Sequence, residues 1–147
     1  MASRFLAELA PEYVLLPRQS VQSFADILVR QLRQTYGDQP QDSPYFGRVC
    51  SAASVARIQR LLTGHGGQVV CGGVVDPQRR YVAPTVIVNP SPDSPVMCEE
   101  VFGPVLCLVA VDSVDEAIQY VRAKPTPLTL YGFTSDPAVE RRLLDEC

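Results

Sequence analysis

The sequence is poor in the residues on which many metal, hydrolytic and phosphate-transfer sites depend. It has one histidine, His65, and one lysine, Lys124, among 147 residues. A site built on several imidazoles is therefore excluded. Neither a Gly-x-Ser-x-Gly nucleophile elbow nor a phosphate-loop lysine motif occurs. These absences argue against hydrolase and kinase chemistry.

Basic patches and long apolar runs are also missing. The net charge is -3, and twelve arginines are spread from Arg4 to Arg142 rather than gathered in a stripe, so we expect no nucleic-acid partner. No apolar run approaches the ~18–20 residues of a membrane-spanning helix. Arg4 and Glu8 interrupt residues 1–10 before a secretory signal could form. We therefore expect a cytoplasmic protein with no transmembrane segment.

The cysteines give no disulfide or metal pattern. There are five, an odd number, and none forms a Cys-x-x-Cys pair, which favours reduced thiols. Cys50 precedes a predicted helix and lies two residues from Arg48, so its thiol is a candidate for activation, with packing as the simpler interpretation. Cys71 and Cys107 lie inside apolar strand patterns and are interpreted as core residues.

Apolar spacing and capping signals predict several helices in a folded domain. The chain is 46% hydrophobic and 20% charged, an ordinary globular composition. Residues 64–67, Gly-His-Gly-Gly, follow a helix pattern and precede a strand pattern, the reverse of a Rossmann fingerprint, and so predict a turn. The expected helices begin at or directly after Val21, Ser51, Ser113 and Asp136.

Apolar runs predict the strands of a mainly parallel sheet. The run Val105–Val111 is wholly apolar, as expected for a strand at the middle of such a sheet. Pro84, inside residues 81–88, indicates an edge, a bulge or a strand start. With residues 128–133 as a further strand, residues 105–133 would form a βαβ unit. We therefore assign the chain to the α/β class, as a partial three-layer αβα sandwich.

The most informative stretch is residues 99–104, Glu-Glu-Val-Phe-Gly-Pro, at the entrance to the strongest strand. Carboxylates accept hydrogen bonds from vicinal diols such as those of ribose, and an aromatic face packs on a flat ring. Glycine permits close approach of a ligand or of another backbone segment. The same residues also fit a solvated acidic turn with no further role, so the pattern alone leaves both interpretations open.

At this stretch the sequence resembles the aldehyde dehydrogenase superfamily, whose Glu-Glu-x-Phe-Gly-Pro motif is matched by Glu99, Glu100, Phe102, Gly103 and Pro104. The similarity covers residues 10–147 as a partial catalytic domain and leaves residues 1–9 unmatched. Residues 127–135 are similar to the class-three branch, which handles fatty and aromatic aldehydes. Other stretches in the family's order are Ala10-Pro11-x-Tyr13, Gly47-Arg48-Val49, Gly72-Gly73 and Arg80-Tyr81-x-Ala83-Pro84-Thr85.

The resemblance implies NAD- or NADP-dependent oxidation of aldehydes to carboxylates. By position, Glu100 would hold the hydroxyls of the nicotinamide ribose, Phe102 would pack beside the nicotinamide ring, and Glu99 would be structural. The family's nucleophile lies in Cys-x-Ala-Pro-x-Tyr, and Glu8 stands at the cysteine position here. The resemblance therefore assigns no catalytic residue and no metal, and we expect the isolated chain to be inactive.

A second hypothesis is a noncatalytic interaction module that associates with a full-length relative through exposed sheet edges. Apolar faces that absent segments cover in the family would then be exposed on this chain. The two hypotheses differ in whether the chain recognises a relative.

Overall fold

Strand β6 (Val105–Val111) lies inside a four-stranded sheet in the computed structural model, which describes residues 10–147. The strand order is β1-β6-β5-β2, with bounds β1 (Tyr13–Pro17), β5 (Thr85–Val88) and β2 (Gln68–Cys71). β1 and β5 both run parallel to β6, whereas β2 is an antiparallel edge strand. The predicted α/β class with a mainly parallel sheet is confirmed, as is the central place of β6.

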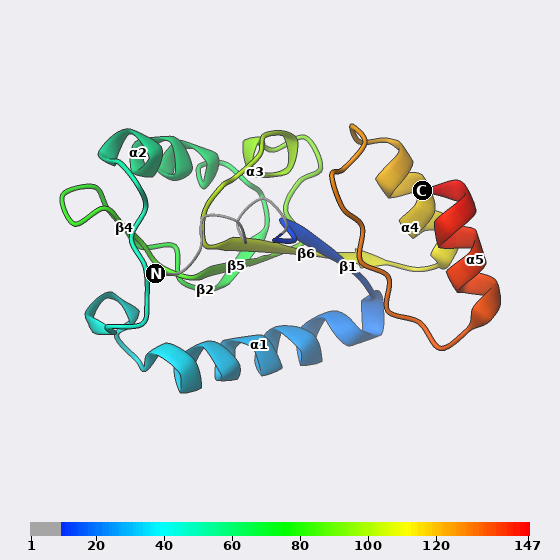
Figure 1. Ribbon diagram of the computed structural model, residues 1–147, viewed down its shortest axis with the longest axis horizontal. Helices are drawn as coiled ribbons and strands as arrows, with labels where there is room; N and C mark the ends of the chain where they lie inside the picture. The colour runs from blue at the N-terminus through cyan, green and yellow to red at the C-terminus, as the bar shows by residue number, and fades with distance from the viewer. Residues whose placement is uncertain (1–9) are drawn as a thin grey trace.

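One long helix covers the first face of the sheet (Figure 1). The 3-10 turn η2 (Arg18–Ser20) leads from β1 into α1 (Val21–Tyr36), and Gly37, with φ of 77°, ends the helix. The apolar stripe of α1 packs on β5 and β6, and the buried side chains of this cluster are Val21, Ala25, Val86 and Leu108.

Two further helices cover the opposite face, so the three-layer arrangement is confirmed (Figure 1). They are α2 (Ala52–Leu61) and the short α3 (Pro95–Cys98). Ile58 of α2 is wholly buried in the same apolar cluster as Cys107 of β6, which places α2 directly over the sheet. Tyr120, in the later helix α4 (Val114–Arg122), packs at the margin of this cluster.

The predicted caps begin the helices as expected. Ser51 accepts a hydrogen bond from the Ser54 amide at the start of α2, and Asp136 accepts one from the Ala138 amide at the start of α5 (Pro137–Glu146). Such bonds satisfy amides that have no partner within the helix.

The capping box at the start of α4 is shifted by one residue from the usual arrangement. Ser113 accepts from the Glu116 amide as expected, but the Glu116 carboxylate accepts from the Asp112 amide rather than from that of Ser113. The bond from the Glu116 carboxylate therefore fixes Asp112, the residue before the Ser113 cap.

The predicted strand over residues 81–88 is two strands with a break at Pro84. β4 (Tyr81–Val82) forms a small hairpin with β3 (Val75–Asp76), and β5 then begins directly after the proline. Pro84 therefore marks a strand start, one of the options that its missing amide allows. The loop before α2 contains a 3-10 turn, η3 (Pro40–Asp42).

The predicted strand over residues 128–133 is wrong, and so is the βαβ unit that depends on it. These residues are irregular and exposed, with Leu128 at 76% and Phe133 at 94% relative exposure. They form the long connection between α4 and α5 (Figure 1). An apolar run becomes a strand only when a neighbouring strand takes up its backbone hydrogen bonds, and none of the described strands pairs with residues 128–133.

None of the described helices is long and apolar enough to span a bilayer.

Candidate functional site

The motif segment 99–104 crosses from α3 to β6 and is fixed by two arginines of α2. Arg57 donates from Nη1 to the carbonyl oxygen of Glu100 at 2.7 Å and from Nη2 to that of Val101 at 2.5 Å. One turn later, Arg60 donates two hydrogen bonds to the carboxylate of Glu99. The Arg60 guanidinium holds the pKa of Glu99 below its usual value. Glu99 is therefore engaged in a structural ion pair, and Glu100 is held through its backbone.

Glu12 fixes the same segment from the side of β1. Its carboxylate accepts a hydrogen bond of 2.7 Å from the Val101 amide, and its own carbonyl accepts one from the Cys107 amide in β6. Burial raises the pKa of Glu12; the Val101 amide opposes that shift, and the nearby charge of Glu100 adds to it. A half-buried carboxylate thus lies beside a second carboxylate at this point of the chain.

Phe102 is presented outward on a strained backbone. Its φ is 49°, in the left-handed region that costs a non-glycine residue about 1–2 kcal/mol. The side chain is 46% exposed. The Glu100 side chain is also exposed, and its carboxylate has no hydrogen-bond or ion-pair partner among residues 10–147. An open aromatic face and an unoccupied carboxylate thus stand two residues apart in the sequence, a combination that fits a flat ring joined to a sugar diol.

The two candidate cofactor residues predicted from sequence are therefore close together, and Phe102 borders a small hollow. This cavity of about 120 Å³ lies between the Ala-Pro stretch that precedes β1 and the motif segment. Its lining residues are Ala10, Pro11, Glu12, Val101, Phe102, Gly103 and Val105. Folding thus joins two stretches, 10–13 and 99–104, that lie almost ninety residues apart. Glu8, at the position of the family's nucleophile, lies outside the described residues.

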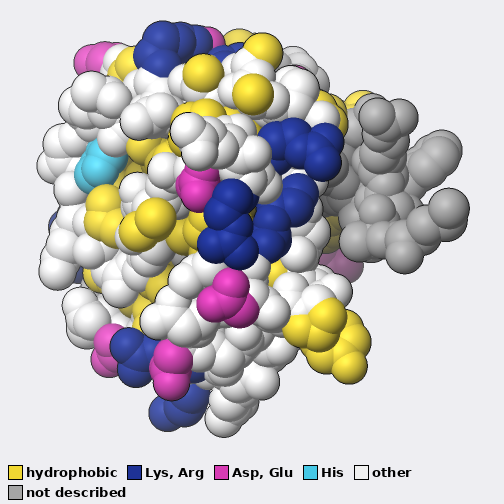
Figure 2. Space-filling model, turned by 90° about the vertical axis from the view of Figure 1, so that its left-hand side faces the viewer, with side chains coloured by type: hydrophobic (Ala, Val, Ile, Leu, Met, Phe, Trp, Pro, Cys, Tyr) yellow, Lys and Arg dark blue, Asp and Glu magenta, His cyan; other side chains and the backbone are white. Residues whose placement is uncertain are grey.

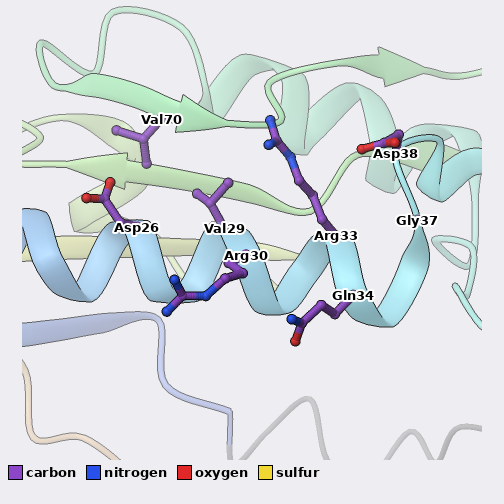
Figure 3. A pocket seen from close by; sticks show the side chains of 8 residues that line it. All are labelled: Asp26, Val29, Arg30, Arg33, Gln34, Gly37, Asp38 and Val70. Atoms are coloured by element: carbon purple, nitrogen blue, oxygen red, sulfur yellow. The ribbon is translucent and has the colours of Figure 1, made fainter.

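A larger cavity, of about 610 Å³, lies elsewhere, between α1 and β2. Figure 3 shows Arg33 reaching from α1 toward the strands, with Asp26 and Asp38 at the two ends of the hollow. Its remaining lining residues are Val29, Arg30, Gln34, Gly37 and Val70. None of them belongs to the motif segment, and the lining offers no aromatic face to a flat ring, so the smaller cavity is the better cofactor candidate.

The cysteines lie outside this arrangement, and none of the described cysteines forms a disulfide. Cys107 is buried in the core as predicted, and burial raises the pKa of its thiol to about 12. Cys50 is exposed before α2, with its sulfur 3.4 Å from the Ser54 hydroxyl. Arg48, the cation expected beside it, donates to the carbonyls of Phe46 and Gly47 and lies over the Tyr81 ring.

The Gly-His-Gly-Gly stretch is a turn between α2 and β2, as predicted. His65 accepts a hydrogen bond from the Gly67 amide at Nδ1, and Gly64 and Gly66 have positive φ.

On the side of the molecule in Figure 2, Lys and Arg side chains lie close to Asp and Glu side chains. Among residues 10–147, Arg79 and Asp42 form an ion pair, with 3.3 Å between Nη2 and Oδ1.

Sequence reasoning missed Glu12 and Arg57. Glu12 falls at the unspecified position of the Ala-Pro-x-Tyr stretch, and Arg57 lies on the polar side of an amphipathic helix. One signal was available: Arg57 and Arg60 are three residues apart, and therefore share a helix face, in a chain with a Glu-Glu pair.

Comparison with known proteins places the chain in a family. The model of the aldehyde dehydrogenase family matches residues 9–147. The chain belongs to this family. It is 40% identical to aldehyde dehydrogenase family 3 member B2 of Mus musculus over 92% of its own length and 28% of the relative's length. It is 36% identical to the dimeric NADP-preferring aldehyde dehydrogenase of Bos taurus over 93% of its length and 56% of the relative's.

The fold is also that of solved aldehyde dehydrogenases. The substrate-bound state of Staphylococcus aureus AldH superposes with a TM-score of 0.87 at 35% identity, covering 93% of this chain and 30% of that one. The chain thus spans less than a third of the S. aureus aldehyde dehydrogenase and of the mouse relative. The relatives identified by sequence include members of family 3, in agreement with the class-three similarity of the sequence.

Proposed function

We propose that this chain supplies part of the nicotinamide site for NAD- or NADP-dependent oxidation of aldehydes to carboxylates. Glu100 accepts hydrogen bonds from the nicotinamide ribose, and Phe102 packs beside the nicotinamide ring. A dinucleotide held by these two residues would supply the hydride acceptor for aldehyde oxidation. One observation carries the proposal: the family motif is held by Glu12 and Arg57 with the Phe102 ring exposed beside the 120 Å³ cavity.

Cofactor binding tests this assignment directly. Purified 147-residue protein is titrated with NAD⁺ and with NADP⁺ in a calorimeter, and Glu100→Gln and Phe102→Ala are each expected to weaken binding about tenfold. Matched controls are Glu140→Gln and Phe133→Ala, which alter an exposed carboxylate in α5 and an exposed ring outside the motif. Equal affinities for the motif and control variants contradict the proposal.

We further propose that this chain is cytoplasmic. We also propose that, in isolation, it does not turn over aldehyde. The nucleophile position holds Glu8, and a carboxylate there would form an anhydride rather than a thioester. The test is aldehyde-dependent production of NADH or NADPH, followed by absorbance, with fatty and aromatic aldehydes. Substantial turnover would refute this part of the proposal without affecting the cofactor assignment.

The alternative, an interaction module, has its own supporting observation. Leu128, Phe133 and Leu144 are large apolar side chains exposed near the C-terminal end of the described chain. Large exposed apolar patches mark association sites, and we propose that these side chains contribute to one. Tagged chain is mixed with a full-length class-three aldehyde dehydrogenase and analysed by size-exclusion chromatography. Coelution that is lost in Leu128→Ser/Phe133→Ser favours the module, and separate elution counts against it.

A further inference from the structure

The backbone of the motif segment is gripped at three atoms by two side chains of opposite charge. Arg57 binds the carbonyls of Glu100 and Val101, and Glu12 binds the Val101 amide. The peptide groups on both sides of Val101 are therefore oriented by side chains. Phe102 follows at once, with its φ of 49°. A strained residue persists where its surroundings over-determine the backbone.

Both side chains have rigid supports. Glu12 immediately precedes β1, and its carbonyl is bonded to the Cys107 amide in the centre of the sheet. Arg57 projects from α2 next to Ile58, which is wholly buried. The backbone of Val101 is thus bonded to one side chain anchored on the sheet, that of Glu12, and to another anchored on a packed helix, that of Arg57.

The charge on Glu12 is unfavourable for stability. Its folded-state pKa is raised above that of an unfolded glutamate, mainly by burial. The folded state therefore binds the proton more readily, and the destabilisation is fully present above the raised pKa and disappears as the pH falls toward the usual value. A neutral glutamine could accept the same amide bond without this cost, so stability alone does not account for the carboxylate.

We propose that Glu12 and Arg57 are positioning residues, which hold the backbone around Val101 so that Glu100 and Phe102 face the nicotinamide end of the cofactor. The inference rests on the proposed function for its cofactor arm. Protonation of Glu12 weakens its bond to the Val101 amide, because charge-assisted hydrogen bonds are about twice as strong as neutral ones. Cofactor affinity consequently falls as the pH is lowered through the titration of Glu12.

The charged and titratable groups that interact electrostatically with Glu12 lie on each of the elements around it. They are Arg57 of α2, Glu100 of the motif segment, Tyr13 of β1 and Cys107 of β6. Burial raises the pKa of Tyr13 and of Cys107, so both stay neutral below pH 8. Glu100 is the one other carboxylate named among these neighbours of Glu12, and Glu100→Gln is therefore included as a background for the pH series.

The bonds that Glu12 and Arg57 make to the backbone of Glu100 and Val101 are called the clamp below. The first experiment measures the clamp in the 147-residue protein without cofactor. Nuclear magnetic resonance follows the Val101 amide against pH in wild type, Glu12→Gln and Glu12→Ala. In wild type its shift is expected to titrate with a pKa above that of free glutamate, and in Glu12→Gln this titration is absent. Amide exchange at Val101 is expected to be about fivefold faster in Glu12→Gln and tenfold or more in Glu12→Ala. Glu116→Gln, which changes another carboxylate that accepts a backbone amide, is the matched control.

Thermal unfolding separates positioning from a merely structural role. At pH 7, Glu12→Gln is expected to unfold at the same temperature as wild type or a higher one while its Val101 amide exchanges faster. A fall in unfolding temperature of Glu12→Gln together with the loss of protection would assign Glu12 to stability and overturn the proposal. An unchanged Val101 amide in Glu12→Gln would overturn it as well. Since glutamine nearly matches glutamate in shape, this variant is informative even where Glu12→Ala does not fold.

The cofactor arm compares Arg57→Lys with Arg60→Lys by calorimetry. Both keep the positive charge, but only the first removes the paired bonds to the Glu100 and Val101 carbonyls. Arg57→Lys and Glu12→Gln are each expected to weaken dinucleotide binding about fivefold, and Arg60→Lys to leave it unchanged. One possible result is that the Val101 amide exchanges as expected in the variants but the chain binds no dinucleotide. This result would refute the proposed function and leave the positioning of Val101 intact. Normal binding after the clamp is lost would overturn the positioning role alone.

Discussion

Ile58 of α2 lies directly against Gly103 of the motif segment. A Cβ atom built on Gly103 would be 2.6 Å from the Cδ1 atom of Ile58, a distance too short for two carbon atoms. Ile58 is wholly buried, so its side chain has little space into which to move. The absence of a side chain at residue 103 therefore allows the motif segment to pack on α2.

Gly103→Ala is expected to lower the free energy of unfolding by about 1–3 kcal/mol, the usual range for overpacking. The clash involves one atom, and Ile58→Val removes that atom at a cost of about 1 kcal/mol by itself. The double variant should therefore be more stable than the sum of the single effects predicts, by about 1 kcal/mol or more. Urea denaturation of the four proteins measures this coupling. Strict additivity would contradict the contact.

Gly72→Ala is expected to be more damaging. A Cβ on Gly72 would be 2.2 Å from the carbonyl oxygen of Pro84, and the φ of 81° is itself unfavourable for alanine. The clash is with backbone, which cannot rotate away, so a loss of about 3 kcal/mol or more is expected. Gly47→Ala is the control, since nothing lies within 4 Å of its Cβ position. Equal unfolding midpoints for the two variants would be inconsistent with the close approach of Gly72 and Pro84.

Thiol labelling distinguishes the buried cysteine from the exposed ones. Burial raises the pKa of Cys107 to about 12, so little thiolate forms at neutral pH. We expect iodoacetamide at pH 8 to label the exposed Cys98 and Cys147 far faster than Cys107. In 6 M guanidinium, roughly enough to unfold most domains, the rates should converge. Mass spectrometry of the peptides gives each rate. Rapid native labelling of Cys107 would place it outside the core.

Tyr120→Phe is expected to increase stability. The Tyr120 hydroxyl is buried and has no hydrogen-bond partner among residues 10–147, so its removal should add about 1 kcal/mol to the free energy of unfolding. Burial also raises the pKa of Tyr120 to about 12. The unfolded tyrosine loses its proton first, so wild-type stability should fall as pH rises from about 10 to 12.

The alkaline loss should be smaller in Tyr120→Phe than in wild type, and unchanged in Tyr45→Phe, whose side chain is exposed. Denaturant titrations at several pH values between 8 and 11.5, about the range where tyrosine titrates, provide the measurement. A Tyr120→Phe protein less stable than wild type would show that the hydroxyl has a partner.

The helices and the central strands could be predicted because their signals are local. Ser51, Ser113 and Asp136 cap helices through bonds to amides within three residues, and β6 is recognised from a continuous apolar run. The motif residues Glu100 and Phe102 were likewise found from their contiguous spacing. Their side-chain roles remain predictions, since they concern a cofactor.

The predicted strand over residues 128–133 shows where local signals are insufficient. Its alternation of apolar residues is compatible with a strand, yet strands also require a partner backbone, which lies at an unpredictable distance along the sequence. Pro84 illustrates the same point with the opposite result. Three positions were open for it from sequence, and pairing of Thr85 with Val105 selected the strand start.

The sequence by itself determined the class of the fold, the helix starts and the family, because apolar periodicity, caps and the Glu-Glu-x-Phe-Gly-Pro motif are all readable within short windows. Only the tertiary structure decided that Glu12, eighty-nine residues away, would accept the amide of Val101 while Arg57 binds the carbonyls on either side of it. The physical reason is that side chains meet backbone groups at 3 Å or less only after the sheet and α2 have packed, and no local pattern encodes that distance.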